Sequence, residues 1–184
     1  MERKSRRLYW LWGIALTLLL GLALFCWLVV VPVWQVRRVT QEFATSGFRD
    51  GYFSSSKQAA PHIEDLGGAG PGARKLALYL RAPRWVEGAH SKGHAYSTYV
   101  LLAYCGKDGL AELVGLLEDG REYERQSALL GLMVFGVNYK RTTYGDTVSC
   151  LEPLLEDDDP EVRELGAKAI ELIKSKYGNP SLPK

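Results

Sequence analysis

The interval from Leu8 to Val36 contains no charged residue, although arginines lie directly on both sides of it. Its sequence is LYWLWGIALTLLLGLALFCWLVVVPVWQV. A helix needs about 20 apolar residues, at 1.5 Å of rise each, to cross the roughly 30 Å hydrocarbon core of a bilayer. Lipid offers no hydrogen-bonding partner to the backbone, so a spanning segment must satisfy its own N–H and C=O groups, as a helix does. The sequence therefore predicts a transmembrane helix over residues 8–36, with the lipid bilayer as a partner.

Aromatic residues mark both ends of this segment. Tyr9, Trp10 and Trp12 lie near its start, and Trp34 lies near its end. Indole and phenol rings favour the boundary between lipid headgroups and acyl chains. The alternative is a cleaved signal peptide, but the apolar part of such a peptide spans only about 7–15 residues and ends in small residues. The longer run, which has no A-x-A pattern near its end, favours a retained anchor.

The basic residues around the segment predict its orientation. The short tail of residues 1–7 is the richer flank, with Arg3, Lys4, Arg6 and Arg7, whereas the other flank carries Arg37, Arg38 and Arg49. Positive residues close to a membrane span tend to remain in the cytoplasm. We therefore expect a cytoplasmic N-terminal tail and an extracytoplasmic C-terminal domain on a single-pass protein.

The remainder of the chain is long enough for one domain with a hydrophobic core. With 23 basic and 21 acidic residues in 184, the formal net charge is only +2, which gives no reason to expect a nucleic-acid partner. Three cysteines are too few for a disulfide framework. Composition thus favours an ordinary globular domain behind the membrane segment.

Two segments in the C-terminal half match each other at an offset of 38 residues. The pattern L-L-E-D occurs at 116–119 and again at 154–157, and Arg125 matches Arg163. A period of this length is typical of stacked pairs of helices. We therefore expect helical hairpins that pack on one another.

The second copy divides into two helices on its own residues. Val148, Leu151 and Leu155 share one face of the first helix. Asp159 is a suitable N-cap for the second helix, and Pro160 is a suitable first residue. The second helix should bury a stripe of apolar and small residues, formed by Val162, Leu165, Gly166, Ala169, Ile170 and Ile173.

The pattern L-x-x-L-L-E-D-D-D-P-E-V-R-x-x-G/A-x-x-A-I, from Leu151 to Ile170, resembles a HEAT repeat, in particular the short PBS-lyase-like variety. Weaker copies precede it, so the resemblance covers roughly residues 60–178. It implies antiparallel helix pairs stacked into a right-handed solenoid. We therefore expect an all-α chain in which one transmembrane helix is followed by a short right-handed α-solenoid of HEAT-like helical hairpins. The expected parts are a basic cytoplasmic tail (1–7), the transmembrane helix (8–36), a linker with a degenerate helical cap (37–67), the solenoid (68–178) and a flexible tail (179–184).

No local motif predicts catalysis, a cofactor or a metal. His90 and His94 are four residues apart, but the glutamate of H-E-x-x-H is missing between them. The glycine-rich segment 66–73 lacks the Lys-Ser/Thr of a phosphate-binding loop. His62 is isolated in the sequence, and we expect it near the start of a helix. We therefore assign no catalytic, cofactor-binding or metal-ligating residue.

Two segments between expected helices, 81–96 and 138–146, combine cations with aromatic residues. Trp, Tyr and Arg are the residue types that dominate binding hot spots at protein interfaces. The candidate partner-binding residues are Arg84, Trp85, His90, Lys92, Tyr96, Tyr139, Lys140, Arg141 and Tyr144. An equally good interpretation is that Trp85 and Tyr96 cover the core of the first hairpin.

These features favour a non-catalytic role, as a membrane-anchored HEAT-repeat scaffold or adaptor that binds a protein partner at the membrane surface. Two alternatives stay open. One is a PBS-lyase-like enzyme or cofactor-attachment factor, which the resemblance alone implies. The other is an accessory or assembly subunit of a membrane complex, in which the span itself contacts other helices.

Overall fold

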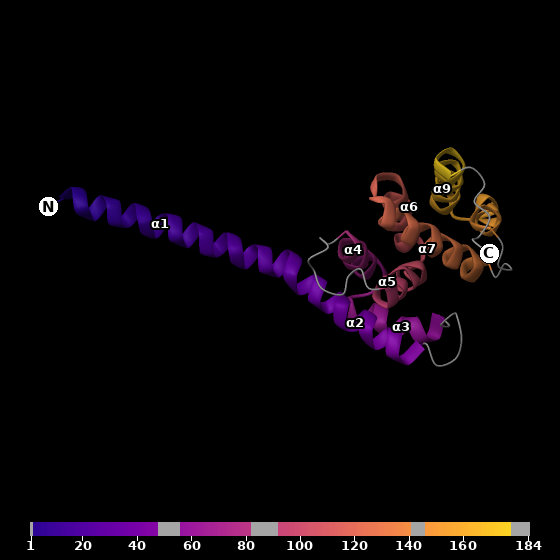
Figure 1. Cartoon of the computed structure of the whole chain (residues 1–184), viewed down its shortest axis with the longest axis horizontal. Coiled ribbons are helices and arrows are strands. Elements are labelled where there is room, and N and C mark those ends of the chain that lie inside the picture. Colours follow the sequence, from indigo (N-terminus) through magenta and orange to yellow (C-terminus); the bar gives the residue numbers. More distant parts are fainter. Residues whose placement is uncertain (1, 48–55, 82–91, 141–145, 178–184) are drawn as a thin grey trace.

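The computed structural model of the chain describes residues 2–47, 56–81, 92–140 and 146–177. Every regular element in these ranges is a helix. One long N-terminal helix projects from a compact group of shorter helices (Figure 1). The expectation of an all-α chain with one long apolar N-terminal helix is therefore confirmed for the described residues.

The projecting helix is continuous, and it consists of α1 (Glu2–Phe25), a π-helical stretch (Cys26–Val30) and α2 (Val31–Gly47). The π-helical stretch comes directly before Pro32, whose nitrogen has no hydrogen to donate to the preceding turn. The wider hydrogen bonding of this stretch, in which Val31 N–H donates to the Cys26 carbonyl, carries the helix past the proline.

The large apolar side chains of α1 are exposed on all sides. Trp10 is 75% exposed, and the leucines from Leu16 to Leu24 are 59–69% exposed. Trp27, in the π-helical stretch that follows α1, is 72% exposed. By its length and composition, the helical stretch Trp12–Thr45 is able to cross a membrane, and an N-terminal signal sequence has the same properties. Nothing in the described part of the chain covers these side chains.

The continuation of this helix, α2, enters the core of the helical domain. Val36, Val39 and Phe43 are buried, and their spacing of three and four residues places them on one helical face. This face packs on α3 (Ser56–Asp65), α4 (Ala69–Leu80) and α5 (Lys92–Tyr104). The linker expected from residue 37 is thus helical as far as Gly47, because the apolar pattern continues beyond the uncharged segment.

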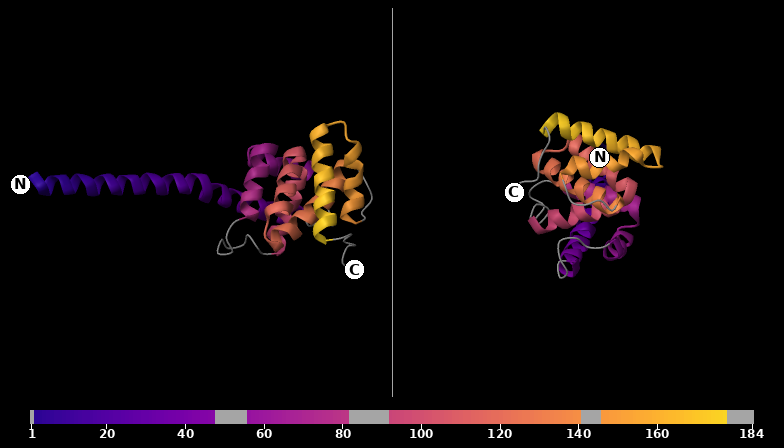
Figure 2. Two further views of the ribbon diagram at one scale, coloured as in Figure 1. Left: turned by 90° about the horizontal axis from the view of Figure 1, so that it is seen from above. Right: turned by 90° about the vertical axis from the view of Figure 1, so that its right-hand side faces the viewer.

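From α4 onwards the helices form pairs. The helix α4 pairs with α5, and α6 (Gly106–Asp119) pairs with α7 (Glu122–Lys140). In the last pair, α8 (Thr147–Leu151) and its 3₁₀ extension (Glu152–Glu156) pack against α9 (Pro160–Tyr177). The first two pairs stack with α4 on α6 and α5 on α7. Gly70, near the start of α4, faces Asp108 near the start of α6, and Arg81, just after α4, faces Glu112. The helices α4 and α6 therefore run in the same direction, and Figure 2 shows them side by side.

The last pair stacks in a different way. Here α9, the second helix of its pair, packs on α6, whereas α8 packs on α7. Lys107 at the start of α6 pairs with Asp159 at 3.2 Å, and Lys176 near the end of α9 donates to the Glu118 carbonyl at 2.7 Å. These contacts at the two ends make α9 parallel to α6, so the layer α4–α6–α9 is continuous.

The second helix of the last pair agrees with its sequence pattern, and the first helix departs from it. The Asp159 carboxylate accepts a hydrogen bond from Glu161 N–H at 2.9 Å, which confirms the expected cap. Leu155, expected on the buried face, is 43% exposed, and Leu154 is buried instead. The reason is the tighter 3₁₀ winding after Leu151, because a 3₁₀ helix places residues three apart on the same side.

Candidate functional site

Most of the candidate partner-binding residues lie outside the described residues. This holds for Arg84, Trp85, His90, Arg141 and Tyr144. Lys92 begins α5 and Lys140 ends α7, but the structure describes neither side chain. The side chains of Tyr96 and Tyr139 are therefore the two that can be examined.

Tyr96 packs against the core of the domain. Its ring meets the Tyr99 ring edge-on, with the centroids 5.1 Å apart, and it is half-buried. Burial raises the pKa of the Tyr99 hydroxyl, and the nearby Tyr96 adds to this effect. Tyr96 thus has the contacts expected of a residue that covers the first hairpin.

Tyr139 lies near the end of α7 and is 43% exposed. Its ring stacks on Phe135 with the centroids 4.9 Å apart. The neighbouring Asn138 accepts a hydrogen bond from Tyr104 Oη at 3.2 Å, which joins the ends of α7 and α5. The Tyr139 ring thus lies partly exposed at the surface, on the buried Phe135.

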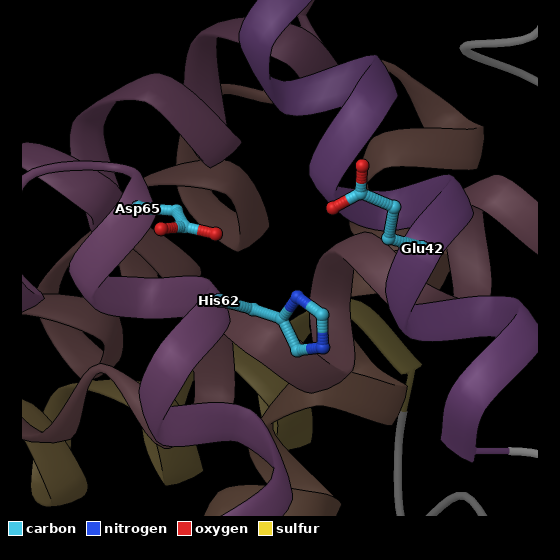
Figure 3. A group of neighbouring side chains, drawn as sticks. All are labelled: Glu42, His62 and Asp65. Atoms are coloured by element: carbon cyan, nitrogen blue, oxygen red, sulfur yellow. The ribbon is translucent and has the colours of Figure 1, made fainter.

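A different group of polar side chains is found where α2 and α3 meet. Glu42 comes from α2, and His62 and Asp65 come from the last turn of α3 (Figure 3). One ligand atom from each residue lies within 4.8 Å of the other two. The expectation that His62 lies near a helix start is wrong, because it lies in the last turn of α3. Although His62 is isolated in the sequence, the packing of α3 on α2 brings it next to Glu42.

The sequence around α3 explains why these side chains face α2. Ala59, Ile63 and Leu66 are buried against the rest of the domain. His62 and Asp65 are three residues apart, so they share an edge of α3 next to that apolar face. The helix then stops at Gly67 and Gly68, whose φ angles of 98° and 89° lie in the region that favours glycine.

Two neighbours hold the group in position. The ring of Phe43, one residue after Glu42, meets the His62 ring edge-on with the centroids 5.4 Å apart. Arg38, one turn before Glu42, donates from Nε to the Glu42 carboxylate at 2.9 Å. Both supporting residues lie on α2, so the arrangement depends on the contact between α2 and α3.

The nitrogen of His62 that faces this group has no hydrogen-bond partner. Figure 3 shows the ring nitrogen next to Cγ, which is Nδ1, turned towards the two carboxylates. The Nδ1 atom is buried, and no hydrogen bond to it is present in the structure. A buried polar atom without a partner is costly and uncommon in a folded protein. Together with two carboxylates, it offers donor atoms of the kinds that bind divalent cations.

Comparisons of the chain with protein-family models, with characterised proteins and with solved structures find no match.

Proposed function

We propose that the protein is a single-pass membrane anchor whose extracytoplasmic helical domain, built of HEAT-like hairpins, binds a protein partner at the membrane surface. The observation that carries this proposal is the unbroken helix from the exposed apolar α1 into the buried face of α2. A continuous helix holds the domain close to the membrane in one orientation, which a flexible linker would not do. Such positioning suits an adaptor.

The same helix supports a retained anchor over a cleaved signal peptide. Cleavage at the end of the apolar run would cut immediately before Arg37, between Val36 and Val39, which both lie in the core. The cut would separate Val36 from its helix and leave α2 with a new, uncapped start inside the packed domain. A signal peptide is removed from the mature protein, so its residues are not expected in the core of the mature domain.

The HEAT-like interpretation is supported by the first two helix pairs. In a solenoid, the first helices of successive pairs lie side by side, and so do the second helices. The packing of α4 on α6 and of α5 on α7 has this form. The last pair, with α9 on α6, departs from it. We therefore assign the regular HEAT-like stacking to residues 69–140 and treat the last pair as a modified end.

Partner binding is assigned to the cation-rich and aromatic segments 81–96 and 138–146. The experiment is affinity purification of the full chain from detergent-solubilised membranes of its own host, followed by mass spectrometry. A chain that ends at Gly47 serves as the anchor-only control. We expect the full chain to retain a partner protein that the anchor-only control does not retain. The Trp85→Ala variant should lose this partner, and its melting temperature should equal that of the parent protein.

Two outcomes would contradict the adaptor proposal. In the first, the full chain retains no protein beyond those of the anchor-only control. In the second, Trp85→Ala lowers the melting temperature and leaves the retained protein unchanged, which would make Trp85 a core residue and remove the assigned site.

A second candidate, an accessory subunit of a membrane complex, is favoured by one feature of α1. A shallow depression on the helix is lined by Trp10, Gly13, Ile14, Thr17 and Leu18. Its floor is Gly13, where an added Cβ would meet nothing within 4 Å. Small residues allow close helix contact in membranes. This candidate predicts that Gly13→Leu, but not Trp85→Ala, removes a co-purifying membrane protein.

A further inference from the structure

The group formed by Glu42, His62 and Asp65 is the place where the described structure brings metal-binding side chains together. It contains one imidazole and two carboxylates, and the His62 nitrogen turned towards the carboxylates is buried without a hydrogen-bond partner. A buried nitrogen in this condition lacks the partner that it needs, which is a donor or a cation for the tautomer without a hydrogen on Nδ1 and an acceptor for the other tautomer. The two carboxylates that face it attract a cation.

The donor set selects the kind of cation. Zinc binds histidine nitrogen at about 2.0–2.1 Å and carboxylate oxygen at about 2.0–2.2 Å, commonly with three protein ligands and a water. Ca²⁺ instead takes six to eight oxygen ligands, and Mg²⁺ keeps several waters in a strict octahedron, so neither gains from an imidazole. One nitrogen and two oxygens therefore favour zinc or a similar first-row metal ion.

The distances allow such an ion to bind with little rearrangement. Ligand atoms around a tetrahedral zinc lie about 3.4 Å apart, given the bond lengths above. The three atoms lie within 4.8 Å of one another. Glu42 and Asp65 are exposed, so their carboxylates are able to rotate inwards without disturbing the core.

The neighbours of the group act as supports for its ligands. The edge contact with Phe43 fixes the plane of the His62 ring. The hydrogen bond from Arg38 Nε goes to Glu42 Oε1 and orients this carboxylate. Outer contacts of this kind orient metal ligands and raise metal affinity. The charges of the two carboxylates and Arg38 add up to one negative charge, which a divalent cation more than balances.

We propose that Glu42, His62 and Asp65 bind a zinc-type divalent cation, which fastens α3 to the membrane-continuous helix α2. The site goes beyond the adaptor role and does not depend on it. Its ligands come from two helices that pack on each other, so a bound ion would strengthen the contact between α2 and α3.

The test is a Zn²⁺ titration of the full chain in detergent, after treatment with a chelator and in competition with a chromophoric chelator. The protein carries no polyhistidine tag, and Cys26→Ser removes the exposed thiol. We expect one zinc ion per chain and a melting temperature that rises with Zn²⁺. His62→Ala, Glu42→Gln and Asp65→Asn should each lower the affinity roughly tenfold or more and remove the rise.

His94→Ala is the matched control, because it removes one histidine and leaves the three ligands in place. It should bind Zn²⁺ like the parent protein. Mg²⁺ at the same concentration should leave the melting temperature unchanged. Glu42 and Asp65 are exposed, so the domain should tolerate Glu42→Gln and Asp65→Asn. The proposal would be overturned if both variants bound zinc with the same affinity as the parent protein. It would also be overturned by a response to Mg²⁺ as large as the response to Zn²⁺.

Discussion

Arg125 and Arg163 make the same hydrogen bond at two successive turns of the chain. Arg125 Nη1 donates to the Gly120 carbonyl at 2.7 Å, and Arg163 Nη1 donates to the Asp158 carbonyl at 3.2 Å. These two acceptors lie five residues before the arginine, in the turn that joins the two helices of a pair. Arg163 Nη1 also donates to the Asp157 carbonyl at 2.5 Å. The two residues that match in the sequence repeat are thus equivalent in the structure.

This equivalence predicts that Arg125→Met and Arg163→Met weaken the domain in the same way. Each change removes a charged donor from turn carbonyls, and each should cost about 1 kcal/mol of unfolding free energy, because both sites are partly open to solvent. Arg125 is the less exposed of the two, so its replacement should cost more. Urea unfolding, followed by circular dichroism, measures the unfolding free energy of each variant. Arg74→Met, on the exposed face of α4, is the control.

Gly136 is predicted to be intolerant of any side chain. A Cβ atom at this position would lie 2.3 Å from the Cys150 carbonyl oxygen, since α7 and α8 approach closely there. Gly136→Ala should therefore lower the unfolding free energy by about 2 kcal/mol. Gly115→Ala is the matched control, because its Cβ would meet only Arg81 Nη2 at 3.5 Å, and alanine favours the helix by up to about 1 kcal/mol. Equal melting temperatures for the two variants would contradict the close approach of α7 and α8.

Asp146 is predicted to stabilise the last helix pair in a pH-dependent way. Its carboxylate accepts hydrogen bonds from Ser149 N at 3.0 Å and Ser149 Oγ at 2.8 Å, and these bonds lower its pKa. A lowered pKa in the folded state means that the stabilisation is complete above the unfolded pKa of about 3.9 and disappears as the pH falls through the folded pKa. Asp146→Ala should cost about 1 kcal/mol at pH 7.

The difference between Asp146→Ala and the parent should shrink when thermal unfolding is followed below the folded pKa. Asp158→Ala, which also removes one carboxylate from a turn in the last pair, controls for net charge. A cost that is the same at neutral and at acidic pH would show that the cap does not act through the ionised carboxylate.

Cys105 and Cys150 are predicted to remain reduced and unreactive. Both are buried, and burial raises the pKa of Cys105 to about 12, with a further contribution from Asp108. The thiolate is the reactive form, so neither cysteine should react with a maleimide until the protein is denatured. Intact-mass analysis after labelling measures this. Loss of two hydrogens mapped to this pair would mean that the helices are stacked in another order.

The sequence predicted the last helix well and the group around His62 not at all. Asp159, Pro160 and Gly166 act through contacts with residues close to them in the chain, and each lies where its residue type indicated. An added Cβ at Gly166 would lie 2.8 Å from Leu154 Cβ, so two helices approach closely at the position where the sequence predicted a buried small residue. Local patterns of this kind are readable because caps and small-residue contacts depend on a few neighbours.

Other features depend on how distant segments pack. Nothing in the sequence indicated that His62 and Asp65 would lie opposite Glu42, because that contact depends on how α3 packs on α2. The exposure of Leu155 follows from a 3₁₀ winding that helical periodicity does not reveal. The entry of α2 into the core was visible in the spacing of Val36, Val39 and Phe43, yet the change in charge at Arg37 suggested a boundary there.

The orientation of the chain is the most direct test of the account, because the adaptor role requires the helical domain on the outside. Lys184→Cys is introduced into a chain with Cys26→Ser, and intact cells are treated with a membrane-impermeant maleimide. Ser5→Cys in the N-terminal tail is the matched control. We predict that Lys184→Cys is labelled in intact cells, whereas Ser5→Cys is labelled only after the membrane is permeabilised. Two results would contradict the account. In the first, Ser5→Cys alone is labelled in intact cells. In the second, the Lys184→Cys chain is cleaved and released from the membrane fraction.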